Sequence, residues 1–438
     1  MKKIVILGST GSIGENALKV VGALPGMFEV AGLVAHTRAA RIVEQALEHR
    51  VGTVVLTDPQ AAQEAAQLAT GTGIAVRSGM GAVCELAAAE GVDLVVCAMV
   101  GMAALGPVLA AVGAGHDVAL ASKEVLVSAG ELVCKRCEAE GVALLPIDSE
   151  HSALFQCLQD TRLLPWCVRR GGAVPRTAGM PCDTFNGWKP SLPCTAVPQT
   201  SAPLRPCARK ESATAIEDTI RRLVLTASGG PFALRADVDF ERVTPKQALA
   251  HPRWLMGRKV TVDSATMMNK GLEILEARWL FNVPVDSIDV LLHPESIVHS
   301  LVEFRDATMV AQLGMPDMRM AIQYAMTWPE RHANATVPRL DLARLGSLTF
   351  RNPDEGRFPC LRLIREAAAA GGTMPAVVNA ADEVAVEAFL GGRLPFTGIW
   401  RTIERVMAAH TVCACADLET VVEADAWARR AAKEEIER

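Results

Sequence analysis

Two short stretches of this 438-residue sequence concentrate acidic, hydroxyl and basic side chains in patterns that suit metal chemistry. The first stretch, 144–151 (LLPIDSEH), ends a strand-like run with Asp148, Ser149 and Glu150 and then opens a helical pattern. Two carboxylates at the end of a buried strand offer the oxygen ligands that Mg²⁺ prefers. Ser149 capping a helix whose first turn is acidic explains the same residues, so this stretch alone leaves both interpretations open.

The second stretch, 262–273 (VDSATMMNKGLE), is denser in polar groups. Lys270 and Glu273 are three residues apart on a predicted helix and therefore share one face. Ser264, Asn269 and Lys270 are suitable donors for a phosphate. We expect this segment to direct a carboxylate and several phosphate ligands into one site.

Two loops add to this set. The segment 226–231 (TASGGP) follows a strand-like run, and its small residues, Ser228 among them, predict an anion-binding nest of backbone N–H groups. The segment 250–259 (AHPRWLMGRK) combines loop breakers with His251 and Trp254, which is typical of an active-site lid. A packing role for Trp254 and a surface hydrogen bond for His251 stay open. For 293–299 (HPESIVH) we expect a structural role, because the acidic segments already provide an oxygen-rich set.

A glycine-rich loop, Gly8–Gly14 (GSTGSIG), connects a strand-like run at 3–7 to a helical pattern at 15–22. Such a loop lets backbone N–H groups approach a pyrophosphate at the helix N-terminus. The next strand-like run ends in His36, Thr37 and Arg38, with no carboxylate to hold a ribose hydroxyl. We predict NADPH rather than NADH, with Arg38 on the 2′-phosphate; a solvated loop charge is the alternative.

The elements that must position these residues follow a regular order. Strand-like runs alternate with helical patterns up to residue 147, at 3–7, 28–34, 53–56, 93–98, 117–120 and 142–147. This rhythm predicts an α/β chain whose N-terminal, NADPH-binding domain (1–147) is a Rossmann-like, doubly wound parallel sheet. We expect an α+β metal and substrate domain (148–325), a linker (326–354) and a C-terminal helical bundle (355–438).

The segment 162–210 fits neither pattern, since it holds eight prolines, four cysteines and two tryptophans without periodicity. We interpret it as an irregular surface insertion, with a metal or partner module as the alternative. Among the 12 cysteines, Cys134 and Cys137 form a C-x-x-C. They fall late in a helical pattern (128–140) rather than at its N-terminus, and no second pair completes a zinc site, so we expect ordinary thiols.

Composition narrows the class of protein. The formal net charge of −5, one Tyr and 11 Phe argue against a nucleic-acid partner. No apolar run approaches the roughly 20 residues that span a bilayer, and the first residues enter a strand directly. We therefore expect a cytoplasmic enzyme that acts on a small molecule.

Taken together, these segments resemble one family, 1-deoxy-D-xylulose 5-phosphate reductoisomerase of the non-mevalonate isoprenoid pathway. The resemblance covers nearly the whole chain except 162–210. Its motifs are 8–14, 121–124 (ASKE), 148–151, 228–232, 251–257, 262–273, 293–299, 314–319 and 379–386. The chain departs from the family at Arg38 and Ser122, where Asn is frequent, and by the insertion.

The resemblance implies conversion of 1-deoxy-D-xylulose 5-phosphate to 2-C-methyl-D-erythritol 4-phosphate by a homodimer with NADPH and Mg²⁺ or Mn²⁺. It assigns the metal to Asp148, Glu150 and Glu273. The substrate, including its phosphate, would contact Lys123, Ser149, Glu150, Ser228, His251, Ser264, Asn269, Lys270 and Glu273. NADPH would contact Thr10, Gly11, Ser12, Ile13, Arg38, Ser122, Glu124 and Gly257, to which we add His36 and Thr37. Lys123, Asp148, Glu150, His251 and Glu273 would be catalytic.

Two other functions remain possible from the sequence. A different NADP-linked dehydrogenase explains the glycine-rich loop without needing three separated acidic ligands. A nucleotide-binding regulator explains it without turnover, and its insertion at 162–210 would recruit a partner. Loss of activity with a chelator separates the first alternative from the reductoisomerase, and binding without turnover identifies the second.

Overall fold

The computed structural model describes residues 1–159, 219–254, 256–415 and 417–438, so the predicted insertion at 162–210 lies outside the described residues. The N-terminal part is built on a seven-stranded sheet of order β4-β3-β2-β1-β5-β6-β7, in which every neighbouring pair is parallel. Its strands are β1 (Lys2–Leu7), β2 (Phe28–Ala35), β3 (Thr53–Leu56), β4 (Ala75–Ser78), β5 (Leu94–Cys97), β6 (Asp117–Leu120) and β7 (Leu144–Pro146).

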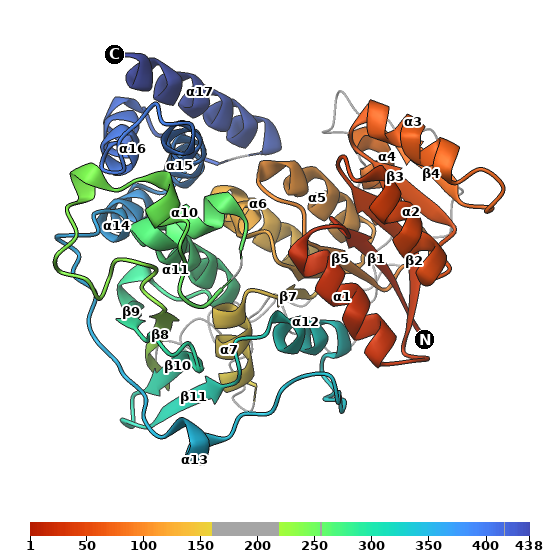
Figure 1. Cartoon of the computed structure of the whole chain (residues 1–438), viewed down its shortest axis with the longest axis horizontal. Coiled ribbons are helices and arrows are strands. Elements are labelled where there is room, and N and C mark those ends of the chain that lie inside the picture. The colour runs from red at the N-terminus through yellow and green to blue at the C-terminus, as the bar shows by residue number, and fades with distance from the viewer. Residues whose placement is uncertain (160–218, 255, 416) are drawn as a thin grey trace, which may run out of the picture.

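Helices connect these strands, and Figure 1 shows them packed around the sheet. They are α1 (Ser12–Ala23), α2 (Ala39–Glu48), α3 (Pro59–Leu68), α4 (Gly79–Ala87), α5 (Leu105–Gly113) and α6 (Lys123–Glu140), with a 3₁₀ turn η1 (Met102–Ala104) before α5. Ile4, Val5, Ile6 and Leu7 of β1 are all fully buried, as expected of a parallel strand covered on both faces. The strand order reverses between β1 and β5, which is where doubly wound sheets bind ligands.

A second, four-stranded sheet of order β11-β10-β8-β9 follows. Its strands are β8 (Ile220–Ala227), β9 (Ile288–Leu292), β10 (Val298–Phe304) and β11 (Met309–Leu313). The associated helices are α7 (Ser149–Cys157), α9 (Pro245–Ala248), α10 (Arg258–Thr266), α11 (Met268–Phe281) and α12 (Met318–Thr327), with 3₁₀ turns η2 (Phe240–Arg242) and η3 (Val285–Ser287). Helices α7 and α11 lie between this sheet and the first one, so side chains from both helices can meet residues at the edge of the first sheet.

The chain ends in helices. After α13 (Leu342–Leu345) come α14 (Cys360–Ala370), α15 (Met374–Leu390), α16 (Gly398–Ala409) and α17 (Leu418–Glu437). α15 is buried along most of its length, packing against α14, α16, α17 and α6. Within the described residues, no helix combines the length and apolarity needed to cross a bilayer.

The structure confirms the predicted α/β class and corrects several details. β4 and β11 were not expected from the sequence, and α1 begins at Ser12 rather than Glu15. Helix α6 begins at Lys123 rather than Ser128, so the expected helical pattern started one turn and a half too late. Cys134 and Cys137 are both buried in α6 and both carry free thiols, which agrees with the expectation of ordinary cysteines.

Candidate active site

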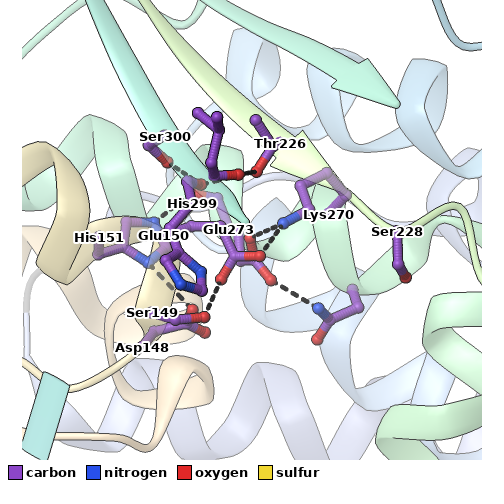
Figure 2. A network of polar contacts seen from close by, with 12 residues as sticks. Asp148, Ser149, Glu150, His151, Thr226, Ser228, Lys270, Glu273, His299 and Ser300 are labelled. Atoms are coloured by element: carbon purple, nitrogen blue, oxygen red, sulfur yellow. Dashed lines mark hydrogen bonds and ion pairs between the residues drawn. The ribbon is translucent and has the colours of Figure 1, made fainter. Parts of the chain in front are cut away.

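The predicted metal ligands converge from two helices, α7 and α11. Asp148 is the N-cap of α7, directly after β7, and Glu150 lies in the first turn of that helix. Glu273 comes from the middle of α11, about 120 residues later in the chain, and is almost completely buried. One carboxylate oxygen from each of Asp148, Glu150 and Glu273 lies within 4.8 Å of the others, and Figure 2 shows the three side chains pointing toward one another.

This cluster fits a divalent cation of the magnesium type. Its donors are all carboxylate oxygens, and an octahedral Mg²⁺ with bonds of about 2.1 Å places neighbouring oxygens roughly 3 Å apart. A spread of up to 4.8 Å therefore requires only a small contraction of side chains. Three protein ligands also leave coordination positions for substrate oxygens and water.

Two lysines compensate the buried carboxylates. Lys123, the first residue of α6, places its Nζ 2.7 Å from Oδ2 of Asp148 and 3.2 Å from Oε1 of Glu273. Lys270, on α11, places its Nζ 2.9 Å from Oε1 of Glu150 and also contacts Glu273. Both lysine side chains are largely buried. Each lysine ammonium therefore lies between two carboxyl groups, so negative and positive groups alternate through the site.

Burial and the neighbouring charges shift the pKa values of Lys123, Asp148 and Glu150. Burial disfavours the ammonium of Lys123, but Asp148 and Glu273 outweigh burial and raise its pKa well above the usual value. Burial likewise opposes ionisation of Asp148, and the Lys123 charge overcomes it and lowers the pKa of that carboxyl. The pKa of Glu150 is raised, first by burial and then by the neighbouring Glu273. Lys123 therefore stays charged beside an ionised Asp148, while Glu150 gains most from an incoming cation.

The predicted phosphate ligands lie beside the carboxylates. Asn269 Nδ2 donates to Oε1 of Glu273 at 2.6 Å, so this amide joins the phosphate segment to the metal cluster. A Cβ on Gly230 (φ +57°) would lie 2.7 Å from the carbonyl oxygen of Ser264, so the predicted nest packs directly against that segment. The loop after β8 and the segment before α11 consequently meet at one place.

His251 joins the same group through Ser228. Its Nε2 lies 3.0 Å from the Ser228 Oγ, and its Nδ1 accepts backbone N–H groups from Arg253 (3.2 Å) and Trp254 (2.8 Å). Because Nδ1 is an acceptor, Nε2 carries the ring proton, and burial lowers the pKa of the imidazole. The contact fixes the beginning of the predicted lid on the predicted phosphate loop.

The glycine-rich loop follows β1 as expected. A Cβ on Gly14 would lie 2.3 Å from the Gly8 carbonyl oxygen, so only glycine allows helix and loop to approach this closely. Ser12 and Ile13 open α1, where the first N–H groups have no partner within the helix. Arg38 reaches across from the end of β2 and donates to the Thr10 carbonyl oxygen at 2.7 Å. The loop is therefore built for an anion, with a guanidinium at its side.

The remaining cofactor candidates are divided between two places. Thr37 and His36 follow β2, and the His36 Nδ1 lies 2.7 Å from Thr57 Oγ1, in the neighbouring loop. Ser122 and the buried Glu124 lie at the start of α6, near the metal cluster. A cavity of about 610 Å³ adjoins Glu124 and extends along Arg258, the residue after Gly257, to α15. The candidates thus lie in two separate places, at the end of β2 and at the start of α6, as expected for contacts with the two ends of an extended cofactor.

The structure also places residues near the cluster that the sequence did not indicate. Buried His299 of β10, for which we expected a structural role, lies among the active-site side chains. Burial lowers the pKa of its imidazole, and Lys270 adds to this effect while Glu150 opposes it. His293 instead hydrogen bonds Thr349 and its own loop, in agreement with a structural role. His151 and Glu276 are fully buried behind the carboxylates. In the sequence, this pair could have been found because each of its members follows a predicted metal ligand, Asp148 or Glu273, by three residues.

Comparison with known proteins matches these features to one family. Sequence models match over residues 4–130 (1-deoxy-D-xylulose 5-phosphate reductoisomerase), 203–281 (its C-terminal domain) and 313–431 (DXP reductoisomerase C-terminal domain). The reductoisomerase of Moorella thermoacetica is 44% identical over 98% of this chain and 97% of its own length. That of Thermodesulfovibrio yellowstonii is 42% identical over 100% of both chains.

Solved structures give the same result. The chain is similar to the reductoisomerase of Zymomonas mobilis in complex with NADPH (TM-score 0.82, 33% identity, 100% and 99% of the two chains covered). It is equally similar to a DOX-P reductoisomerase in complex with NADPH, fosmidomycin and magnesium (TM-score 0.82, 35% identity, 100% and 98% covered). Both similarities extend over the sheets and the helical end of the chain.

Proposed function

The chain belongs to the 1-deoxy-D-xylulose 5-phosphate reductoisomerase family, and from this premise we propose how its residues perform the family's reaction. It is an NADPH-dependent oxidoreductase that converts 1-deoxy-D-xylulose 5-phosphate to 2-C-methyl-D-erythritol 4-phosphate with a divalent metal. The observation that carries the assignment of residues is the carboxylate cluster of Asp148, Glu150 and Glu273 between the two sheets.

These three carboxylates would hold Mg²⁺ or Mn²⁺. When bound, the cation supplies Lewis acidity toward the substrate's ketone and a neighbouring hydroxyl oxygen. Lys123 lies at the same place with a raised pKa, so its ammonium remains available to donate to an oxygen that gains negative charge. Ser149, next to both acidic residues of α7, would contact the substrate from that side.

Binding of the phosphate sets the position of the reacting carbons. Ser228, His251, Ser264, Asn269 and Lys270 would hold it at the junction of the β8 loop and α11. Contacts distant from the bonds that change hold the substrate in register and contribute to rate as well as to affinity. The loop 251–257 begins at His251 itself, so phosphate binding and the covering of the site share one residue.

Reduction of the rearranged aldehyde requires the cofactor at the same edge of the first sheet. Thr10, Gly11, Ser12 and Ile13 would hold the pyrophosphate, and Arg38 the 2′-phosphate together with His36 and Thr37. Ser122, Glu124 and Gly257 would contact the end of the cofactor that lies next to Lys123. The carboxyl edge of a doubly wound sheet thereby brings hydride donor and metal site together.

A direct test follows NADPH oxidation with 1-deoxy-D-xylulose 5-phosphate, with and without Mg²⁺, in the wild-type chain and in Glu273→Gln. The matched control is Glu366→Gln, a half-exposed glutamate of α14. Loss of several kcal/mol of transition-state stabilisation corresponds to a fall of at least about 100-fold in kcat for Glu273→Gln. The control should retain wild-type turnover.

Two results would contradict the proposal. Folded, metal-loaded wild-type protein that binds NADPH but does not oxidise it would refute the activity. Turnover by Glu273→Gln close to the wild-type rate would refute the ligand assignment while leaving the activity intact.

We also propose a homodimer, a cytoplasmic location and the division into an NADPH domain (1–147), a metal and substrate domain (148–325), a linker (326–354) and a helical domain (355–438). The support for dimerisation is β11, an edge strand with Met309, Val310 and Leu313 exposed. The described cysteines are all free thiols, which suits a reducing compartment. Light scattering of the wild type and of Val310→Lys tests the dimer.

A further inference from the structure

The helices that carry the metal ligands each repeat a polar residue one turn further on. On α7, His151 follows Asp148 by three residues, and on α11, Glu276 follows Glu273 by the same interval. Both second residues are completely buried and face each other. The repeat therefore places a second pair, His151 and Glu276, in the interior behind the predicted metal ligands. Figure 2 shows His151 beside these carboxylates.

His151 connects the two helices through both ring nitrogens. Its Nε2 lies 2.8 Å from the backbone carbonyl oxygen of Glu273, and its Nδ1 lies 3.1 Å from Oε2 of Glu276. A carbonyl can only accept, so Nε2 carries a proton and donates it. Nδ1 and Oε2 approach each other within ion-pair distance, so the second ring nitrogen makes a polar contact with the Glu276 carboxyl.

Burial of this pair costs desolvation free energy, because both side chains are fully buried and water does not reach them. A buried carboxyl or imidazole without a hydrogen bond costs the full desolvation of the group. Within the described residues, the Glu276 carboxyl has only the imidazole of His151 within ion-pair distance. In the same part of the chain, neither its oxygens nor the His151 Nδ1 has a hydrogen-bond partner, so this polar contact is the main one that these atoms make. Helices α7 and α11 are thus held at the separation at which this contact forms.

We propose that Glu276 is a positioning residue: through His151 it fixes the backbone of Glu273, and so the spacing of the metal ligands on α7 and α11. Glu276 contributes no ligand atom to the Asp148, Glu150 and Glu273 cluster. Its effect on the reaction passes through the His151 ring and the Glu273 carbonyl group. The inference rests on the proposed function of that cluster.

A second cation between Asp148, His151 and Glu276 is the competing interpretation, since their ligand atoms also lie within 4.8 Å of one another. The distances favour the positioning role. The His151 Nδ1 to Asp148 distance is 3.9 Å against 3.1 Å to Glu276, so the ring is aimed at the glutamate. Lys123 also raises the local positive charge close to Asp148.

The experiment compares Glu276→Gln, Glu276→Met and the surface control Glu366→Met in the full-length chain. Mn²⁺ affinity is measured by electron paramagnetic resonance, NADPH affinity by fluorescence, and kcat as a function of Mn²⁺ concentration. Gln can still donate to or accept from the His151 Nδ1, whereas Met fills the same space without a hydrogen bond. Outer partners of metal ligands typically contribute about 10–100-fold in affinity.

We expect Glu276→Met to raise the Kd of Mn²⁺ by about 10–100-fold, with most of kcat restored by excess Mn²⁺. Glu276→Gln should stay within about threefold of the wild type, since a polar group of the same shape still faces the His151 Nδ1. NADPH affinity should be unchanged in both, and Glu366→Met should match the wild type. The combination of His151→Phe with Glu276→Met should be no worse than the poorer single variant, because the two act as one unit.

Three results would overturn the proposal. Wild-type Mn²⁺ affinity in Glu276→Met would show that the pair does not position the ligands. Equal losses in the Gln and Met variants would show that the polar contact with His151 does not position the ligands. Two Mn²⁺ bound per wild-type chain, falling to one in Glu276→Gln, would make Glu276 a ligand of a second cation. A wild-type chain without turnover but with these affinity changes would instead refute only the proposed function.

Discussion

The buried ion cluster that joins α10 to α15 gives a non-additive prediction for stability. Lys259 Nζ lies 2.7 Å from Oδ2 of Asp263 and 2.8 Å from Oδ2 of Asp382. Both aspartate side chains are almost completely inaccessible. The pKa of Asp263 is raised well above its usual value by burial and then by Asp382, so its surroundings favour the neutral acid at this position beside Lys259.

This charge state decides the cost of each substitution. Asp263→Asn or Asp382→Asn alone leaves one carboxylate for Lys259, because removing one acid removes the repulsion that kept the other protonated. Each single variant should therefore cost about 1 kcal/mol, the value of one altered hydrogen bond. The double variant leaves a largely buried ammonium without a counter-charge, for which a cost of about 3–5 kcal/mol is typical. The interaction energy between the two substitutions should thus be about 1–3 kcal/mol.

The assay is urea denaturation of the four proteins (wild type, two single variants and the double variant), followed by tryptophan fluorescence at pH 7.5. Differences in the midpoint at constant slope give the changes in the free energy of unfolding. Strict additivity of the two single costs would refute the shared-proton account. A cost above about 3 kcal/mol for either single variant would do the same, since it would mean that both carboxylates are ionised in the native protein.

Three further predictions concern other parts of the chain. Gly14→Ala should weaken NADPH binding at least about tenfold in calorimetry, because the added Cβ would lie 2.3 Å from the loop backbone. Gly22→Ala, which has open space around it, should leave the affinity unchanged, and equal affinities of the two variants would contradict this prediction. Iodoacetamide at pH 8 should label exposed Cys413 long before Cys137, whose pKa burial raises to about 12; peptide mass spectrometry that finds Cys137 labelled in folded protein contradicts this. Burial lowers the pKa of His410, so the unfolded chain binds the proton more readily and stability should fall as pH drops below about 6.5. His410→Gln should flatten that fall in thermal unfolding between pH 7.5 and 5.5, and parallel curves would refute the assignment.

The parts of the fold that the sequence predicted are those in which burial is complete. β1 shows an uninterrupted apolar run because helices cover both faces of its sheet. β4 (Ala75–Ser78) and β11 (Met309–Leu313) are edge strands with mostly exposed or half-exposed side chains. A strand that is paired on one side and solvated on its faces has no such run, so local pattern did not indicate either of them.

The active site divides along a similar line. Local spacing predicted which residues of α7 and α11 would carry chemistry, since both segments place several polar groups within one turn. That Glu273 meets Asp148 and Glu150 depends on how two sheets pack, which no local pattern encodes, and here the family resemblance supplied the grouping. His299 cannot be placed by local pattern. It falls at the register shift between Val298 and Ser300 in the pairing of β10 with β11, and this irregularity depends on how the strands pair.

The lysines of the active site are the link between the folded protein and the reaction. Lys123 and Lys270 place two positive charges among three carboxyl groups that lie in a small and largely buried space. A divalent cation bound by the same carboxylates would take over that compensation, and the ammonium groups would then be free to turn from Asp148 and Glu150 toward substrate oxygens. Under the proposed function, the residues that stabilise the cluster in the fold would therefore also serve the substrate once metal is bound. We expect removal of either lysine to affect folding and catalysis for the same electrostatic reason.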